Sequence, residues 1–542
     1  MKFRNIKICI ISLFFLVYSS FCNTDLTAPR LTVIFVVDGM AHHYIQKLRD
    51  KLTGGLKFLL DNGIVYENAY YPHATPKTGI GHVALNVGTF AKDHGITDNS
   101  WFENGKEIYF PEDSSPAATV FSKDGTPMPY GRSGKRIMIE GISDHFVMYP
   151  KASGKNYAIS LSFKDRSAIG TVGSLGKAIW YDKKVGCFTS SKAYFDTLPS
   201  WVVEFNNAKK IDQIKKIVWY PAYCLDTPYY KFKNAFNYEF ASKKSVLCKE
   251  VDELVITPLA NNLLFDLAKK CIETFLYNGK NNRLLLWVSF SPLDKVGHVF
   301  GPNSAEAIDI IYHIDKRMKR FIDFLQTRIN KKDVLFALTA DHGVDPIPEL
   351  LKQEGLRNAA RIDRHDFVNK INALVEKRFG IPKTFVDYDS NKLFLTPGVF
   401  DNIDDKKKNN VEKLIKRFVK GQSFVKNVWT YDELANKIFK RNTIEGFFKN
   451  QLYPGRSGDF LVQLYPYCQI TKYKKGTSHY SPYECSTHVP LLFYQKDAFE
   501  GRIVHERVSM LQFANSLAQI LQVPKSPAST FDILPGLFAC GG

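Results

Sequence analysis

Six side chains of the types that bind divalent metal ions follow short apolar segments or lie in compact motifs. The carboxylates are Asp38, Asp294 and Asp341, and the imidazoles are His298, His342 and His479. Carboxylate oxygens and imidazole nitrogens are borderline donors that suit zinc. Three of each are enough for two adjacent divalent ions, so the sequence predicts a two-metal centre.

Four apolar segments lead to charged residues and predict the elements that position them. LTVIFVV (31–37) precedes Asp38, YAISLSF (157–163) precedes Lys164 and Arg166, LLLWVSF (284–290) precedes Asp294, and VLFALTA (334–340) precedes Asp341. Each segment is too short for a helix and reads as a buried strand of a parallel sheet. Ligands of open α/β sheets bind outside the carboxyl ends of the strands, so we expect one site at one edge.

The segment PHATPKTGIGHVALNVGT (72–89) supplies a candidate nucleophile, Thr78. The hydroxyl would lie where a loop enters a helix, and backbone N–H groups there favour negative charge. Threonine is a weak nucleophile at its ordinary pKa, and a cation is one way to activate it. Two metal ions roughly 4 Å apart can hold the attacking and leaving oxygens of a displacement at phosphorus.

These motifs resemble the alkaline phosphatase superfamily. Within it, the chain is most similar to the periplasmic phosphate-irrepressible bacterial alkaline phosphatases that use a threonine nucleophile. The motifs are Thr78-Gly-Ile-Gly-His82, His94-Gly-Ile with Asn99 and Trp101, Ser162-Phe-Lys164-Asp-Arg166, Val296-Gly-His298 through Ser304, Arg456-Ser-Gly-Asp459 and Gly476-Thr-Ser-His479. The match spans most of residues 31–525.

The resemblance implies an α/β fold and a set of roles. The fold would be a three-layer sandwich with a central, mostly parallel sheet, a smaller inserted α/β subdomain and a cap segment. One Zn²⁺ would be held by Asp294, His298 and His479, and the other by Asp38, Asp341, His342 and the oxygen of Thr78. Asn99, Lys164 and Arg166 would bind the phosphoryl oxygens. The reaction would pass through a covalent phosphothreonine.

Lys164 and Arg166 favour phosphate monoesters as substrates. Residues two apart at a strand end project to the same side, so both cations can reach one phosphoryl group. A monoester dianion carries more nonbridging charge than a diester, and a lysine with a forked arginine can neutralise it. The alternative is a phosphodiesterase or nucleotide pyrophosphatase of the same superfamily, which resembles this site but lacks the pair. A sulfatase would need Cys or Ser where Thr78 stands.

Some positions have competing interpretations. His488 competes with His479 for the last ligand position, and the Gly-Thr-x-His pattern favours His479. His82 and His94 read as structural or supporting groups. Two residues depart from the family pattern: Gly79 stands where some relatives carry alanine, and Tyr480 stands where glycine is usual, next to His479.

The N-terminus predicts export, with a signal peptide over residues 1–22. Lys2, Arg4 and Lys7 precede an apolar stretch from 8 to 21. That stretch falls short of the roughly 20 residues of a membrane-spanning helix, which disfavours a retained anchor. Phe21 is a poor match for lipidation of Cys22. We therefore expect a periplasmic or secreted protein without a stable membrane span.

The 542 residues and their composition, 45% hydrophobic and 14% aromatic, indicate a globular protein. The formal charge is +19, and it would fall to +16 if cleavage removed the three basic residues of the signal peptide. The cations are dispersed, so we expect no nucleic acid partner. The sequence leaves the oligomeric state open, and we favour a monomer. A polyanion-binding protein with a degenerate site remains the alternative from another class. Cysteines are few, and Cys224 with Cys248 and Cys468 with Cys485 are the candidate disulfides.

The order of segments predicts the organisation of the chain. Residues 23–354 would form the catalytic core, with a cap insertion at about 191–255. Residues 355–470 would form the inserted subdomain, and 471–542 would return to the core. Periodicity and flanking residues predict helices over 257–275, 304–325, 410–418 and 431–439.

Overall fold

The computed structural model describes residues 28–151, 154–209, 211, 219–224, 227–230, 251–277, 279 and 281–538. The predicted signal peptide lies outside these residues, as do Cys248 and much of the predicted cap. None of the helices in the described ranges has both the length and the apolar content that crossing a membrane needs.

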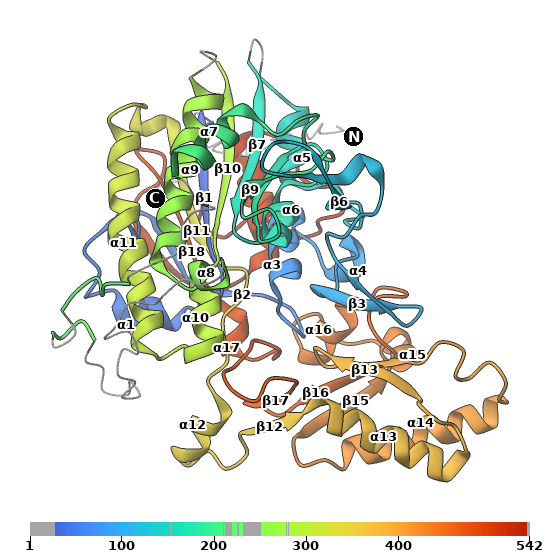
Figure 1. Ribbon diagram of the computed structural model, residues 1–542. Coiled ribbons are helices and arrows are strands. Elements are labelled where there is room, and N and C mark those ends of the chain that lie inside the picture. The colour runs from blue at the N-terminus through green and yellow to red at the C-terminus, as the bar shows by residue number, and fades with distance from the viewer. Residues whose placement is uncertain are drawn as a thin grey trace, which may run out of the picture.

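A nine-stranded sheet forms the centre of the molecule (Figure 1). In spatial order its strands are β19 (Arg502–Ser509), β2 (Ile64–Tyr70), β18 (His488–Gln495), β11 (Val334–Thr339), β1 (Leu31–Val37), β10 (Arg283–Phe290), β7 (Asn156–Ser162), β8 (Lys177–Asp182) and β9 (Cys187–Thr189). The run from β11 to β8 is parallel, and β18 and β9 pair with its two ends in the antiparallel sense. The sheet is therefore mostly parallel, as predicted.

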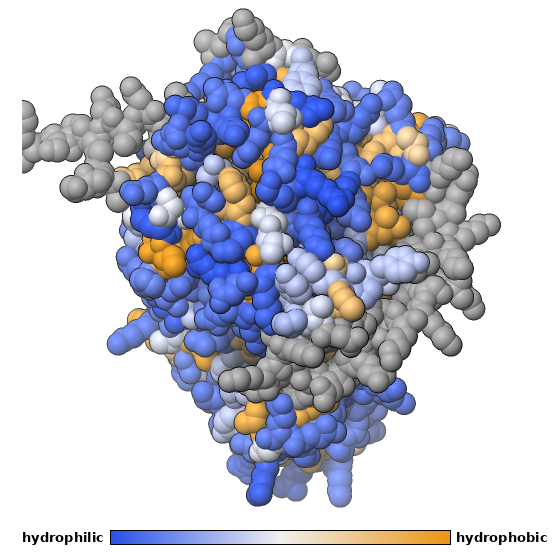
Figure 2. All heavy atoms as spheres, turned by 90° about the vertical axis from the view of Figure 1, so that its left-hand side faces the viewer, coloured by the Kyte–Doolittle hydropathy of each residue, from blue (hydrophilic) through white to orange (hydrophobic). Residues whose placement is uncertain are grey.

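Helices cover both faces of this sheet and complete the predicted three layers (Figure 1). One face carries α2 (Gly55–Asn62), α7 (Ser200–Lys209), α9 (Pro258–Leu276), α10 (Pro292–Phe300) and α11 (Ala305–Gln326). The other carries α3 (Thr78–Val87), α5 (Ile142–Met148), α6 (Asp165–Val172) and α18 (Phe513–Leu521). The outer surface on the α11 side is mostly hydrophilic, and its hydrophobic residues are scattered (Figure 2).

The four predicted strands are β1, β7, β10 and β11. They are adjacent in the order β11-β1-β10-β7 and parallel, so their carboxyl ends meet at one edge. Every residue of β1 is buried. The Phe35 ring packs against the rings of Phe290 and Phe336 on the neighbouring strands, with ring centroids 6.1 and 6.2 Å apart. Burying such a side chain stabilises the fold by roughly 1.5–3 kcal/mol. Helices on both faces explain why these strands are apolar throughout.

A second sheet, of strand order β13-β14-β16-β15, has a hydrophobic core of its own and lies at the bottom of Figure 1. Its strands are β13 (Phe385–Asp389), β14 (Lys392–Leu395), β15 (Val425–Thr430) and β16 (Phe460–Leu464), and its long helices are α13 (Arg364–Phe379) and α14 (Asp405–Lys420). The chain enters through β12 (Ala360–Asp363) and leaves through β17 (Cys468–Thr471), which pair in parallel. We call residues 360–471 the small unit. The predicted boundaries at 355 and 470 stay predictions.

Shorter elements connect these parts. They are α1 (His43–Leu48), α4 (Ala91–His94), the hairpin of β3 (Ser100–Glu103) and β4 (Lys106–Tyr109), the hairpin of β5 (Thr119–Phe121) and β6 (Pro127–Gly131), α8 (Val251–Val255), α12 (Pro348–Gln353), α15 (Tyr431–Asn436), α16 (Ile444–Asn450) and α17 (Glu484–Thr487).

The predicted helices exist, with shifted ends. Ser304 caps α11 by accepting the N–H of Ala307 at 3.2 Å, which fixes its predicted start. α14 is longer than predicted because Asp404 caps it by accepting the N–H of Lys407. α15 ends at Asn436, since Lys437 is already extended.

The predicted disulfide between Cys468 and Cys485 is wrong. Both thiols are free. Cys468 donates to the carbonyl of Asn358 at 3.0 Å, and Cys485 donates to Asp345 at 2.8 Å. Each thiol therefore has its own hydrogen-bond acceptor, and the two cysteines form no disulfide. The other candidate pair cannot be compared, because Cys248 lies outside the described residues.

Candidate active site

Asp38, Asp341 and His342 form the first metal-ligand group, in which potential ligand atoms lie within 4.8 Å of one another. Asp38 follows β1, and the other two follow the neighbouring β11. Nε2 of His342 lies 3.5 Å from Oδ1 of Asp38 and 3.3 Å from Oδ2 of Asp341. The parallel pairing of the two strands brings these residues together.

Asp294, His298 and His479 form the second metal-ligand group, also within 4.8 Å. Asp294 and His298 lie one turn apart on α10 and therefore share a face. His479 comes from a loop after β17. Nε2 of His298 and of His479 lies 3.2 and 3.7 Å from Oδ1 of Asp294.

The three imidazoles share one hydrogen-bonding pattern. Their Nδ1 atoms lie 2.7–2.8 Å from backbone carbonyl oxygens, of Gly343 for His342, Thr477 for His298 and Pro76 for His479. A carbonyl can only accept, so the tautomer that fits these contacts carries its proton on Nδ1 and leaves a lone pair on Nε2. Each lone pair points at a carboxylate, which is the arrangement of histidines that bind a metal ion.

The carboxylates also lack partners on the sides that face the imidazoles. Oδ1 of Asp38, Oδ1 of Asp294 and Oδ2 of Asp341 are buried and accept no hydrogen bond from the described residues. A buried acceptor without a partner is costly, and a cation between it and an imidazole lone pair removes that cost. The two groups therefore fit divalent metal ions.

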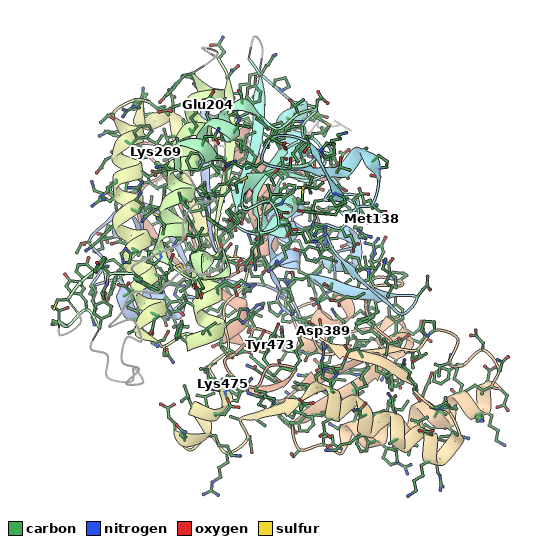
Figure 3. The ribbon with its side chains drawn as sticks, viewed as in Figure 1. Met138, Glu204, Lys269, Asp389, Tyr473 and Lys475 are labelled. Atoms are coloured by element: carbon green, nitrogen blue, oxygen red, sulfur yellow. The ribbon has the colours of Figure 1, made fainter. Side chains whose placement is uncertain are left out.

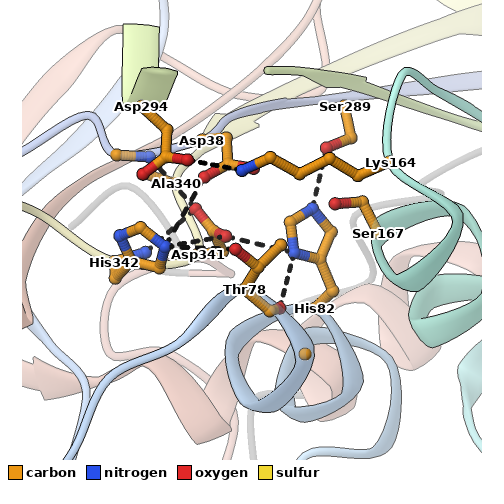
Figure 4. Close-up of polar contacts among 12 residues, drawn as sticks. Asp38, Thr78, His82, Lys164, Ser167, Ser289, Asp294, Ala340, Asp341 and His342 are labelled. Atoms are coloured by element: carbon orange, nitrogen blue, oxygen red, sulfur yellow. Dashed lines mark hydrogen bonds and ion pairs between the residues drawn. The ribbon is translucent and has the colours of Figure 1, made fainter. Parts of the chain in front are cut away.

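Lys164 is the cation that both groups contact (Figure 4). Its Nζ donates to Oδ2 of Asp38 and to Oδ2 of Asp294, each at 2.5 Å. Burial and the charge of Asp341 raise the pKa of Asp38 to about 6, against the effect of Lys164. Burial opposes ionisation of Asp294 too, but Lys164 and His298 hold its pKa well below the usual value.

The expectation that Lys164 and Arg166 project to the same side of a strand end is wrong. β7 ends at Ser162, Lys164 occupies the N-cap position of α6 without a capping hydrogen bond from its side chain, and Arg166 belongs to the first turn of α6. The alternation of side chains along a strand therefore does not apply here, and it gives no reason for both side chains to reach one phosphoryl group. Lys164 points to the carboxylates instead, and Arg166 points to Tyr109.

Arg166 is held by residues that sequence reasoning missed. Its Nη1 donates to the hydroxyl of Tyr109 at 3.4 Å, and Tyr109 in turn donates to Asp165. Nε of Arg166 is buried without a hydrogen-bond partner among the described residues. Arg132 completes this network with a 2.8 Å bond from Nε to Asp165. No motif marks Tyr109 or Arg132.

Thr78 is the first residue of α3, as predicted, and its Oγ1 lies 3.5 Å from Nε2 of His342. The helix approaches the metal-ligand edge closely. A Cβ built at Gly81 would lie 2.2 Å from the carbonyl oxygen of Asp341, so only glycine fits there. Nδ1 of His82 donates to the carbonyl oxygen of Thr78 at 2.9 Å, and its Nε2 lies 2.8 Å from the hydroxyl of Ser289, so His82 holds the start of α3 against β10.

Asn99 lies beside the start of α3. Its Oδ1 accepts the N–H of Gly79 at 2.8 Å, which leaves the Nδ2 end as the donor. A Cβ on Gly79 would lie 3.2 Å from that oxygen, so the glycine gives Asn99 room. His488 lies elsewhere, stacked on His42 at 4.3 Å and bonded to the carbonyl of Glu67. It belongs to neither metal-ligand group.

The sequence model of one protein family, the type I phosphodiesterases and nucleotide pyrophosphatases, matches residues 32–489 of this chain. The chain belongs to this family. The family is part of the alkaline phosphatase superfamily, and the protein is an alkaline-phosphatase-like hydrolase.

Individual relatives match along nearly the whole chain. The alkaline phosphatase PhoV of Synechococcus elongatus is 28% identical and covers 94% of this chain and 93% of its own. A calcium-transporting ATPase of Myroides odoratus is also 28% identical, covering 96% and 97%. The crystal structure of wild-type alkaline phosphatase PafA superposes with a TM-score of 0.82 at 22% identity, over 95% of this chain and 99% of that chain. This likeness establishes the fold.

Proposed function

We propose that this protein is an exported two-zinc alkaline phosphatase that hydrolyses phosphate monoesters through a phosphothreonine at Thr78. The observation that carries the proposal is the meeting of the Thr78 hydroxyl, two metal-ligand groups and Lys164 at one sheet edge. The names of relatives such as PhoV and PafA support the phosphatase activity.

Zinc suits the donor set, since each group offers imidazole nitrogen together with carboxylate oxygen. Asp38, Asp341, His342 and the Thr78 oxygen would hold one ion, and Asp294, His298 and His479 the other. When bound, the two ions supply positive charge that activates a hydroxyl or water and stabilises a leaving oxygen.

The reaction would take two steps. In the first, Oγ1 of Thr78 gives its proton to solvent and forms a bond to phosphorus, while the bond from phosphorus to the leaving oxygen breaks and that oxygen takes a proton from solvent to depart as the alcohol. In the second, a water oxygen loses a proton and bonds to phosphorus while the bond to Oγ1 breaks, and Oγ1 takes up a proton, which releases phosphate and restores the hydroxyl. Asn99 and Arg166 would donate to the nonbridging oxygens, where charge is greatest in the transition state.

Lys164 would serve both the protein and the substrate. It pairs with one carboxylate of each metal-ligand group. Cations held by those carboxylates would compete with its ammonium and favour its pairing with an anionic phosphoryl group instead.

A phosphodiesterase is the second candidate, favoured by the description of the family model. The two activities differ in the charge that the site must neutralise. A monoester dianion gains more from Arg166 than a diester monoanion does.

The test compares kcat/KM of the zinc-loaded protein for 4-nitrophenyl phosphate and for its methyl diester. We expect a strong monoester preference, reduced about 100-fold in Arg166→Ala because charge-assisted contacts to the transition state are lost. Arg166 is the better probe than Lys164, since Lys164 contacts the metal ligands directly. A diester preference that Arg166→Ala leaves unchanged would assign the protein to the phosphodiesterases.

Arg317→Ala is the matched control. Arg317 is likewise a partly buried arginine held by a neighbouring side chain, Asp266, but it lies on α11 and its partner on α9, outside the proposed site. We expect unchanged kinetics. Zinc content measured on each variant separates lost metal from lost phosphoryl binding.

Export is part of the proposal and has its own test. Residues 1–22 carry the basic and apolar segments of a signal peptide. N-terminal sequencing of protein recovered outside the cytoplasm should find a chain that begins near residue 22. An intact N-terminus in the cytoplasmic fraction would contradict export.

A further inference from the structure

The tip of the β13–β14 hairpin, residues 390–392, is buried beside the loops of the active site. Ser390 and Asn391 have φ values of 50° and 66°, as a two-residue hairpin turn requires. Such turns usually lie in solvent. Here Ser390, Asn391 and Lys392 are only 1%, 3% and 2% exposed. Figure 3 shows Asp389, the residue before the tip, at the side of the small unit that faces the rest of the molecule.

Lys392 holds the segment that leads into Asn99. Its Nζ donates to Oδ2 of Asp98 at 2.7 Å and to the carbonyl of Thr97 at 3.1 Å. The other oxygen of Asp98 accepts the N–H of Asn99 at 2.7 Å. A single buried carboxylate therefore connects the ammonium of Lys392 to the backbone of Asn99.

Gln451, a second residue of the small unit, joins the same segment to the one before Thr78. Its Nε2 donates to the carbonyl of Thr97 at 3.0 Å, and its Oε1 accepts the N–H groups of Ala74 and Thr75 at 3.0 and 3.1 Å. Both Lys392 and Gln451 thus end on the carbonyl of Thr97, two residues before Asn99.

The tip also reaches the loop of His479. Nδ2 of Asn391 donates to the carbonyl of Tyr480 at 2.5 Å. The ring of Tyr480 lies 3.7 Å from Nζ of Lys77, which is itself 3.9 Å from Asp98. The ring of Tyr480 therefore borders the buried pair of Lys77 and Asp98.

We propose that Lys392 and Gln451 are positioning residues for Asn99, so that the small unit completes the active site of the main sheet. The inference rests on the proposed function, in which Asn99 binds a phosphoryl oxygen. Two sets of contacts fix Asn99. The N–H of Gly79 donates to its side-chain oxygen, and the small unit holds its backbone through Thr97 and Asp98. A displacement of about 1 Å at such a residue can cost on the order of 100-fold in rate.

Lys392→Met is the informative substitution. Asp98 would keep Lys77 as a second cation, so its carboxylate would not be left buried without compensation. We expect the variant to fold and kcat/KM for 4-nitrophenyl phosphate to fall about tenfold through kcat, since misplacement weakens transition-state contacts.

The decisive measurement repeats the change in an Asn99→Ala background. If Lys392 acts through Asn99, the second loss should shrink to about twofold or less, because coupled residues are not additive. Equal losses in both backgrounds would overturn the inference and leave Lys392 a purely structural residue. Gln451→Leu, tested in the same two backgrounds, gives the same answer if Lys392→Met does not fold.

Two controls separate the possible failures. Lys416→Met breaks an ion pair with Glu433 inside the small unit, away from the tip, and should leave kcat/KM unchanged. Full activity in Asn99→Ala alone would remove Asn99 from the proposed mechanism and overturn this inference with it. Full activity in Lys392→Met beside an impaired Asn99→Ala would overturn the inference only.

Discussion

The two metal-ligand groups contain similar donors but are built differently. Asp38, Asp341 and His342 are fully buried and follow the adjacent strands β1 and β11. In the second group, Asp294 and His298 share the short helix α10, and the side chain of His298 is 29% exposed. His479 comes from a loop 181 residues further along the chain than His298.

The difference shows two ways of fixing a ligand. The parallel pairing of β1 with β11 brings the first group together. The second group depends on close packing between α10 and the His479 loop. Gly476 has φ +77°, and a Cβ there would lie 2.1 Å from the carbonyl of His298, so only glycine allows this approach. We therefore expect the first group to be the more rigid and the second to be the more accessible.

The largest effect should come from Thr78→Ala, which removes the nucleophile beside the first group. We expect kcat to fall by about 10⁴-fold or more, since the covalent route is lost. The zinc content should decrease little, because three protein ligands remain in each group. Mass spectrometry of the acid-quenched wild type should find phosphate on Thr78. Ordinary turnover by Thr78→Ala would contradict the mechanism and the proposed role of the first group.

The next effect concerns Lys164, which joins the two groups. Lys164→Ala should lower the free energy of unfolding of the metal-free protein by about 3 kcal/mol, because buried carboxylates lose their cation. With zinc bound the loss should be smaller, since the ions compensate the same charges. Urea denaturation with and without zinc measures both values. Equal losses with and without zinc would mean that the metal ions and Lys164 act on different charges. The control is Lys270→Ala, which breaks an exposed ion pair with Glu204.

Sequence reasoning predicted the elements of the site better than the contacts within it. The strands were predictable because an apolar run followed by Asp38 or Asp341 leaves one arrangement in a parallel sheet. The direction of the Lys164 side chain was not predictable. The chain enters α6 after Phe163, so side chains no longer alternate as they do along a strand.

Long-range contacts account for most of what could not be predicted. Lys392 lies 294 residues from Asp98, and Gln451 lies 376 from Thr75. Neither stands in a motif, and their partners are set by how the small unit packs on the main sheet. The free thiol of Cys468 shows the same limit, because closeness in sequence to Cys485 said nothing about its acceptor.

The smallest expected effect is kinetic and compares the two groups directly. A dilute chelator should remove zinc in two phases, with the second group losing its ion first. Water and chelator can reach His298, whereas all three residues of the first group have no exposed surface. Rapid mixing with a coloured chelator would resolve the phases. His298→Ala should abolish the fast phase and leave the slow phase, because only the second group loses a ligand. A single phase in the wild type, or loss of the slow phase in this variant, would show that accessibility does not distinguish the groups.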